Sequence, residues 1–189
     1  MGVKGGFDVA FDNIKSILET YSAAQPAEER YIVNADYYRN LPAKAGAYVF
    51  LYLSSINPDA SRSAGNVHFA YDVDYGLDLI ALGKGTQGTE YTRADEAAGI
   101  RFRYLLQQVL NALYQPDKPN LGLPKGTISK KPMLRIEPLP PEMQIGERPI
   151  VGARLTLTLG MAWEPGLLAG DDLTKIEVTA DKWSALFEP

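Results

Sequence analysis

The sequence predicts a single α+β domain. A mainly antiparallel sheet with strands of mixed length packs against an N-terminal helix and one long amphipathic helix, with long loops or hairpin arms between the elements. Two segments space their apolar residues like one face of a helix, and two others alternate apolar and polar residues as strands do. A chain of 189 residues has the length of one ordinary domain and can bury a substantial core.

The composition is that of a folded globular chain, with 46% hydrophobic and 22% charged residues. The formal net charge of −4 disfavours general binding to nucleic acid or to anionic membranes. Cysteine is absent, which excludes disulfides, thiolate metal sites and cysteine nucleophiles. The first residues lack the apolar core of a signal peptide, and the longest apolar run, Ala45–Leu53, is far shorter than a membrane span. We therefore expect a soluble, cytoplasmic chain.

The first third of the chain predicts one helix and two strands. Apolar residues from Phe7 to Tyr21 recur at helical spacing with polar residues between them. Tyr31–Val33 is a short β-prone segment, and Ala47–Leu53 is apolar or aromatic on both faces, as in a central strand. The polar segment Ser54–Asn66 then predicts a long hairpin tip.

The next segment, residues 67–82, predicts a long strand. Its odd-numbered positions from 67 to 75 are apolar or aromatic, whereas the even-numbered ones carry His68, Asp72 and Asp74. One face should therefore be buried and the other exposed to water. Gly76 interrupts the pattern as a bulge would, and leucines continue the strand as far as Leu82.

The second half of the chain predicts a long helix and two further strands. Thr92–Tyr114 has the helical stripe and ends before a proline, and Thr92 with Asp95 approximates a capping box. A short strand at Met133–Ile136 and a long alternating strand at Val151–Trp163 follow. The last predicted elements are a short strand at residues 176–178 and a helical turn at residues 182–186.

Both the strands and the connections are unusually long. The segments 67–82 and 151–163 would each span about 40 Å, longer than most strands in single domains. Four connections also exceed the usual length: residues 54–66, 115–131, 138–149 and 164–172. Two interpretations stay open, because the connections are either ordinary surface loops or arms that contact neighbouring copies or partners.

The segment Gly83–Gly88 matches the dinucleotide-binding pattern G-x-G-x-x-G. That fingerprint needs its last glycine in the first helical turn and an acidic residue about 20 positions further on, at the end of the next strand. Here the helix pattern begins only at Thr92, after the last glycine. The position where the acidic residue should stand falls within the helix, near Leu105. We interpret the segment as a strand-to-helix loop and expect no cofactor.

The sequence also offers weak support for catalytic or metal sites. His68 is the only histidine and shares its strand face with Asp72 and Asp74, but one imidazole and two carboxylates make a poor ligand set. A solvated polar face is favoured, so we expect no metal site, no catalytic residues and no enzymatic activity. Arg93, Arg101 and Arg103 lie near the start of the long helix, where they suit a phosphate or salt bridges to a partner.

The layout of these elements resembles that of the tail terminator (tail-completion) proteins of long-tailed bacteriophages. The likeness spans residues 7–165 of the single domain 1–189 and makes residues 166–189 a C-terminal extension. It is carried by the segments Ala47–Leu53, Tyr71–Leu79, Ala97–Tyr114, Pro132–Pro138 and Val151–Leu157.

The resemblance implies a structural virion assembly protein. Such a subunit forms a hexameric ring on the finished tail tube, ends tube polymerisation and joins the tail to the head connector. Its implied partners are further copies, the tail tube protein and the connector or neck protein, with DNA passing through without specific binding. No cofactor and no membrane are implied, and its place would be the tail or neck of the virion, after assembly in the host cytoplasm.

Under this resemblance the residues of interest lie on loops and on one strand face. The 83–91 loop and the 54–66 hairpin are expected as contact arms, with an interface formed by Lys84, Gln87, Tyr91, Arg93 and Arg103. The strand face that carries Asp72, Asp74 and Asp78 is expected to line the ring lumen and to repel DNA phosphates.

Other classes remain open. The chain is alternatively another head–tail neck or baseplate subunit, or the cap of a contractile injection system. In different classes, it is a nucleotide-dependent protein that uses the Gly83–Gly88 loop, or a small-ligand module that uses the tyrosine-rich sheet.

Overall fold

A computed structural model of the chain describes residues 6–35, 44–59, 69–84, 93–118, 120–123, 127–139 and 150–163. Predictions on other residues lie outside this part. They include the tip of the 54–66 hairpin, the strand at 176–178 and the helical turn at 182–186. The elements follow one another as α1 (Gly6–Ala23), the 3₁₀ turn η1 (Ala27–Glu29), β1 (Ile32–Ala35), β2 (Gly46–Pro58), β3 (Phe69–Leu82), α2 (Ala94–Leu113), β4 (Ile128–Pro138) and β5 (Ile150–Trp163).

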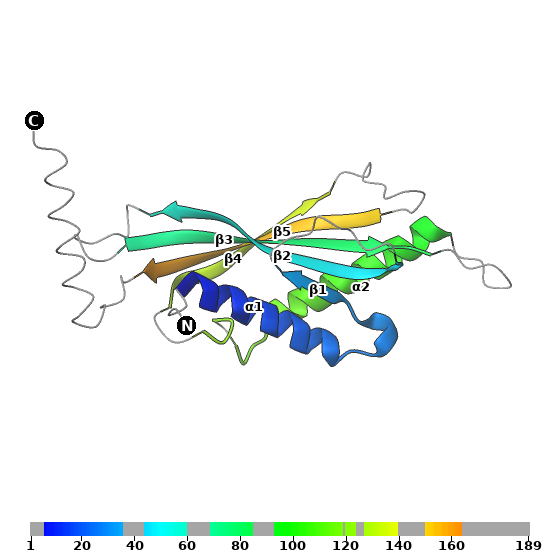
Figure 1. Cartoon of the computed structure of the whole chain (residues 1–189), viewed down its shortest axis with the longest axis horizontal. Coiled ribbons are helices and arrows are strands. Elements are labelled where there is room, and N and C mark those ends of the chain that lie inside the picture. Colours follow the sequence, from blue (N-terminus) through cyan, green and yellow to red (C-terminus); the bar gives the residue numbers. More distant parts are fainter. Residues whose placement is uncertain are drawn as a thin grey trace, which may run out of the picture.

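The strands form one twisted sheet in the order β1-β2-β3-β5-β4 (Figure 1). β1 runs parallel to β2, and every other neighbouring pair is antiparallel. The predicted α+β class with a mainly antiparallel sheet is confirmed.

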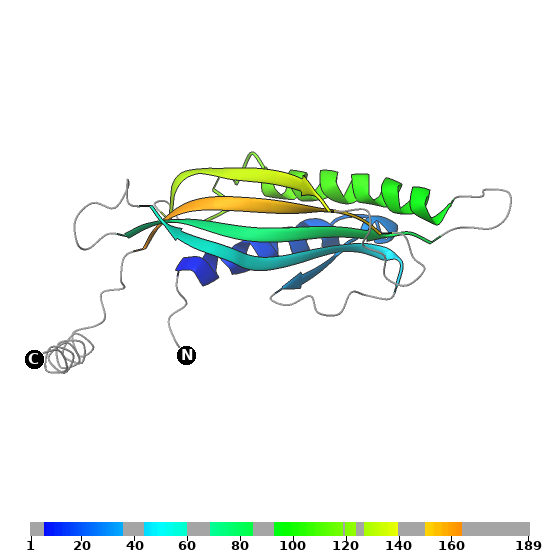
Figure 2. The ribbon, with the colours of Figure 1, turned by 90° about the horizontal axis from the view of Figure 1, so that it is seen from above.

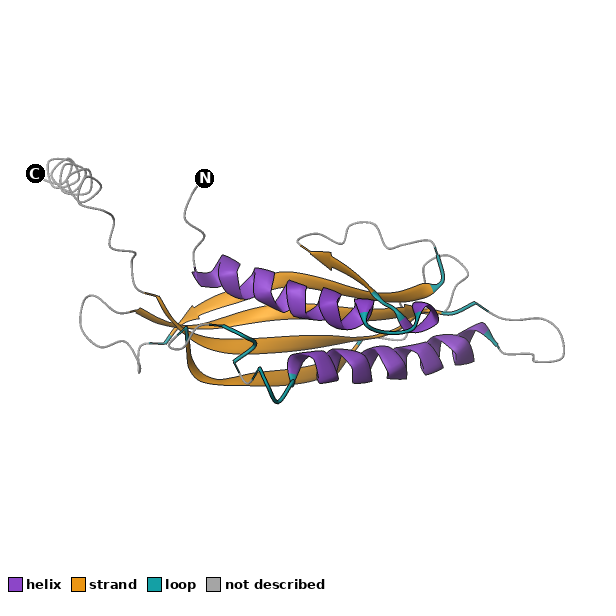
Figure 3. Ribbon diagram, turned by 90° about the horizontal axis from the view of Figure 1, so that it is seen from below, coloured by secondary structure: helices purple, strands orange, loops and turns teal. Residues whose placement is uncertain are grey.

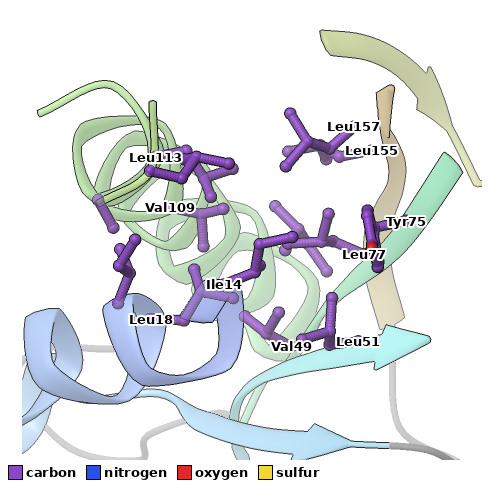
Figure 4. Packing of buried hydrophobic residues seen from close by; sticks show 14 of the residues in the cluster. Ile14, Leu18, Val49, Leu51, Tyr75, Leu77, Val109, Leu113, Leu155 and Leu157 are labelled. Carbon is purple, nitrogen blue, oxygen red and sulfur yellow. The ribbon is translucent and has the colours of Figure 1, made fainter. Parts of the chain in front are cut away.

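Both helices cover the same face of the sheet (Figures 2 and 3). We call this face of the sheet the core face and the opposite one the outer face. Ile14 and Leu18 of α1 and Val109 and Leu113 of α2 point toward the strands (Figure 4) and are almost fully buried. They meet the apolar residues on the core face of β2, β3 and β5, so this layer contains the main hydrophobic core.

Both predicted helices are present. α1 covers the predicted range 7–21, and α2 corresponds to the predicted helix 92–114. The proposed cap residue Thr92 lies outside the described residues. Arg93 occupies the N-cap position of α2 and makes no side-chain cap hydrogen bond.

The long strands are also present. β3 and β5 pair along all 14 of their residues, a length of about 45 Å. The 20-residue α2 is about 30 Å long and the 18-residue α1 is shorter, so neither helix alone covers the whole length of these strands.

Two strands are longer than the sequence predicts. β2 continues to Pro58 and takes in the first part of the predicted hairpin tip. β4 extends beyond Met133–Ile136 on both sides and includes Pro132 and Pro138. Because β4 is an edge strand, a proline there need not break a bond to a second neighbour. The predicted strand is too short because prolines stand at both of its ends, and a proline usually marks the end of a strand.

The predicted bulge at Gly76 is wrong. Gly76 pairs in regular register with both Tyr52 and Thr156, and the irregularity lies in β2 between Leu53 and Ser55. The Tyr52 ring lies over Gly76, where a Cβ would stand 2.3 Å from Tyr52 Cζ. The glycine therefore makes room for an aromatic ring rather than for a bulge.

Two buried tyrosines make the fold sensitive to alkali. Burial raises the pKa of both phenols above the ordinary value for tyrosine. Nearby Tyr21 adds a smaller increase to the pKa of Tyr31, and Asp8 does the same for Tyr75. The Tyr31 hydroxyl donates to the carbonyl of Leu18, and the Tyr75 hydroxyl donates to that of Phe7, both over 2.9 Å.

The raised pKa values predict a loss of stability above pH about 10, where the phenols ionise in the unfolded chain but stay neutral in the folded one. Their contribution is complete below that pH and falls by up to about 1.4 kcal/mol per pH unit for each tyrosine above it. Urea unfolding followed by circular dichroism from pH 8 to pH 11.5 tests this. The Tyr31→Phe/Tyr75→Phe variant should lose stability less steeply with pH, whereas Tyr104→Phe, at an exposed position, should follow the parent chain.

Candidate functional site

The outer face of the sheet carries no helix among the described residues (Figure 2). It has an apolar end and a polar end. At the apolar end, Tyr48, Phe50, Ile80 and Leu82 form a second buried cluster, with Leu139 and Ile150 packed against it. The outer face is therefore buried at this end, beyond residues 67–75, for which the alternation predicts an exposed face.

The polar end begins at an ion pair between neighbouring strands. Asp78 of β3 stands directly opposite Arg154 of β5. Nε and one terminal nitrogen of Arg154 donate to the two Asp78 oxygens over 2.7 and 2.9 Å, and the Tyr52 hydroxyl donates to the same carboxylate over 3.2 Å. The Asp78 side chain is 6% exposed, against 43% for Arg154. The expectation that Asp78 lies on a water-exposed face is wrong, because this pair and the Tyr52 ring enclose it.

Further along the strands, Asp74 is half-buried and accepts two hydrogen bonds. Ser55 Oγ of β2 donates to it over 2.7 Å, and Thr158 Oγ1 of β5 donates over 2.6 Å. Asp72, two residues earlier on the same face, is half-buried as well. These two carboxylates are the acidic groups of β3 that the outer face presents to solvent.

Each side of the sheet ends in an exposed strand. β1 pairs only with Tyr48–Leu51 of β2, so none of the described strands lies beside residues 53–58 of β2 on that side. We call residues 53–58 the β2 edge. Residues 133–137 of β4, at the other side of the sheet, form the β4 edge.

A groove lies between η1 and the first half of α2. Its volume is about 360 Å³, and its lining includes the apolar or aromatic side chains of Ala97, Ile100 and Tyr104. The charged residues Glu28, Glu29, Lys84 and Arg101 also line it. Arg101 also donates to the carbonyl of Leu82 over 2.8 Å, which ties α2 to the end of β3.

Of the three predicted interface residues that are described, two lie at or beside this groove. Lys84 lines it, and Arg103 lies on the adjacent surface with Ile100 and Tyr104. Arg93 is exposed and forms an ion pair with Asp95 at 3.1 Å. Gln87 and Tyr91, like His68, lie outside the described residues.

Gly83, the first glycine of the G-x-G-x-x-G pattern, has a packing role. A Cβ at this position would stand 1.8 Å from the carbonyl oxygen of Ala94, in the first turn of α2. The end of β3 and the start of α2 therefore touch through their backbones. The remaining glycines of the pattern lie outside the described residues.

The sequence analysis missed Arg154 and the hydroxyls that surround Asp74. Their signal was present, because Arg154, Thr156 and Thr158 occupy the polar parity of the last long strand. Which of these side chains stands opposite Asp74 or Asp78 depends on the register between β3 and β5. The alternation of residues within one strand does not give that register.

Within the described ranges, no group of three or more His, Cys, Asp or Glu side chains is placed to hold a metal ion. No helix in that same part of the chain is long and apolar enough to span a membrane.

No protein-family model and no curated protein matches the chain. Among solved structures, the chain is similar to the sheath/tube terminator of an extracellular contractile injection system named PVC, determined by cryo-EM in the extended state. The TM-score is 0.39 and the identity 17%, and the alignment covers 88% of this chain and 60% of the other. This chain thus matches less than two thirds of that protein.

Proposed function

We propose that the chain is a structural subunit that caps a tail tube as a ring, ends polymerisation of the tube and joins it to the head connector. The observation that carries the proposal is a sheet that, within the described residues, has helices on one face only and an exposed strand at each side. A ring needs a wall around its channel and two different contact surfaces on each copy. The outer face is suited to the first task and the two edges to the second. The layout resemblance over residues 7–165 supports the same assignment.

The direct test is tube capping. Purified chain is added to polymerising tail tube protein of the same particle, and tube lengths are measured by negative-stain electron microscopy. We expect shorter tubes with a ring at one end, and a ring of about six copies by native mass measurement. Unchanged tube lengths with bare ends would overturn the proposal.

The same experiment on whole particles separates the neighbouring assignments. A labelled copy at the head-proximal end of the tube supports the cap, whereas a label at the distal end supports a baseplate subunit. A label at the end of a sheathed tube without a head supports the cap of a contractile injection system.

The outer face leads to a prediction about DNA. Asp72 and Asp74 on the lumen wall would repel phosphates and let DNA slide without sticking. Asp78 is excluded from this role because Arg154 neutralises it and the sheet buries it. Asp72→Asn/Asp74→Asn should therefore slow DNA ejection from assembled particles.

The matched control for this charge change is Asp95→Asn/Glu96→Gln, which removes the same two charges from exposed positions on α2. Ejection is followed by the fluorescence of a DNA-binding dye. Equal ejection rates for the outer-face variant, the control and the parent would contradict the lumen assignment while leaving the capping test unaffected.

A further inference from the structure

We infer that copies of the chain join by strand pairing, with the β2 edge of one copy antiparallel to the β4 edge of the next. The inference rests on the ring of the proposed function and names the two surfaces that hold it together. It predicts one sheet that continues from copy to copy, with the helices of all copies on the same side.

The β2 edge lacks the features that keep edge strands apart. Edge strands are usually blocked by charged side chains, by shortness or by a covering segment. Between Lys44 and Asp59 the sequence has no charged residue, and Pro58 stands only at the end of the strand. Leu53 and Ile56 are 46% and 39% exposed, so neither is covered. Among the described residues nothing covers this edge, so it is open to another strand.

The β4 edge differs from the β2 edge in carrying charge, but its two charged side chains have opposite signs and pair with each other. Its Ile136 is 44% exposed, and Arg135 and Glu137 form an exposed ion pair at 2.6 Å. β4 hydrogen-bonds to β5 on one side, and no described strand lies on the other. Within the described residues, each copy thus has two different edges with no strand beside them.

The two edges match in direction. β2, β3, β5 and β4 alternate in direction across the sheet, so β4 runs opposite to β2. A neighbouring copy rotated about an axis along the strands therefore places its β4 antiparallel to β2. The contact is heterologous, and repeating it produces a ring when the rotation closes.

The edges also match in polarity. Leu53 and Ile56 pair with Tyr75 and Val73 on the core face, and Ile136 pairs with Leu155 on that face as well. The side chains on the outer face are mostly polar at both edges, namely Ser55 and Asn57 on β2 and Arg135 and Glu137 on β4, with Met133 as the apolar exception. A continuous sheet would keep the apolar layer and the mainly polar layer aligned across the joint.

Cross-linking tests the pairing directly, because the chain has no cysteine of its own. Ser55→Cys, which the register places level with Met133 on the outer face, is mixed with Met133→Cys, Arg135→Cys or Glu137→Cys under mild oxidation. Within one copy the two edges are three strand spacings apart, about 14 Å, which no disulfide can bridge. Any disulfide in a doubly substituted chain must therefore join two copies.

We expect at least one mixed pair to form a covalent dimer, and the corresponding doubly substituted chain to form a ladder on a denaturing gel. Each single variant alone should stay uncross-linked, as should Ser55→Cys mixed with Glu96→Cys on α2. A single variant that cross-links to itself as efficiently as the mixture would indicate a two-fold contact and overturn the inference. No cross-linking of any mixed pair at high protein concentration would overturn it as well.

Charge placed on the β2 edge gives an independent measurement. Leu53→Lys/Ile56→Lys should weaken self-association by about tenfold or more, since lysines on an edge oppose strand addition. Tyr104→Lys changes a side chain on α2 that is more exposed than Leu53 or Ile56, and it should leave the association constant unchanged. Weakening by Tyr104→Lys alone would place the contact at the α2 groove instead.

The outcomes also separate the inference from the proposed function. Edge cross-links without capped tubes would uphold the pairing and reject the cap. Capped tubes without edge cross-links would uphold the cap and reject the pairing.

Discussion

Replacing Gly83 with alanine is expected to cost about 3 kcal/mol of folding free energy, at the upper end for overpacking. The added Cβ would meet the Ala94 carbonyl oxygen at 1.8 Å and the Ala98 backbone nitrogen at 2.9 Å. Neither atom belongs to a flexible side chain, so α2 would have to move away from β3. Chemical denaturation of the variant measures the loss.

Gly99→Ala is the matched control for this substitution. A Cβ at Gly99, inside α2, has nothing within 4 Å. Alanine there should stabilise the chain by about 0.5–1 kcal/mol because it favours the helix. If Gly83→Ala were as stable as Gly99→Ala, the close contact between β3 and α2 would be refuted. Nucleotide addition is a useful second measurement, since a packing role for Gly83 predicts no shift in melting temperature.

Removing the Asp78 carboxylate is expected to cost about 2–3 kcal/mol, because Asp78→Ala leaves Arg154 without its bidentate partner. The cost is held below the range for a fully buried pair because Arg154 is 43% exposed and can turn toward water. Tyr52 loses a hydrogen-bond acceptor in the same change.

A double-mutant cycle isolates the pair. Asp78→Leu combined with Arg154→Met should recover much of the loss of the single variants, since an apolar pair can replace a buried ion pair at little cost. Glu137→Ala, which breaks the exposed Arg135–Glu137 pair, should cost under about 0.5 kcal/mol. Additive effects of Asp78→Leu and Arg154→Met would contradict a direct coupling between the two side chains.

Spacing within one segment was enough to predict the helices and the long strands. The α1 and α2 stripes and the alternation of β3 and β5 depend only on which residues are apolar and how they repeat. Boundaries were less accurate where proline stands in a strand, as in β4, because edge position is a property of the whole sheet.

The outer face required information that a single segment does not contain. Asp72, Asp74 and Asp78 look equivalent along the chain, yet Asp78 is buried beneath Tyr52 and Arg154 while the other two are half-buried. The difference comes from the neighbours that the register places across the ladder. The β2 edge was likewise hidden, because its exposure results from the four-residue length of β1.

The position of β5 in the sheet determines the order in which the protein can be completed. β2 and β3 are consecutive in the chain and can pair early, but the other side of β3 pairs with β5, the last described strand to be synthesised. Such a distant pairing is slow to form, because the chain between the two strands loses conformational entropy before the contacts between them can stabilise it. Until β5 has paired, the backbone of the apolar middle part of β3 is open on one side. We therefore expect nascent or truncated chains that lack β5 to aggregate first.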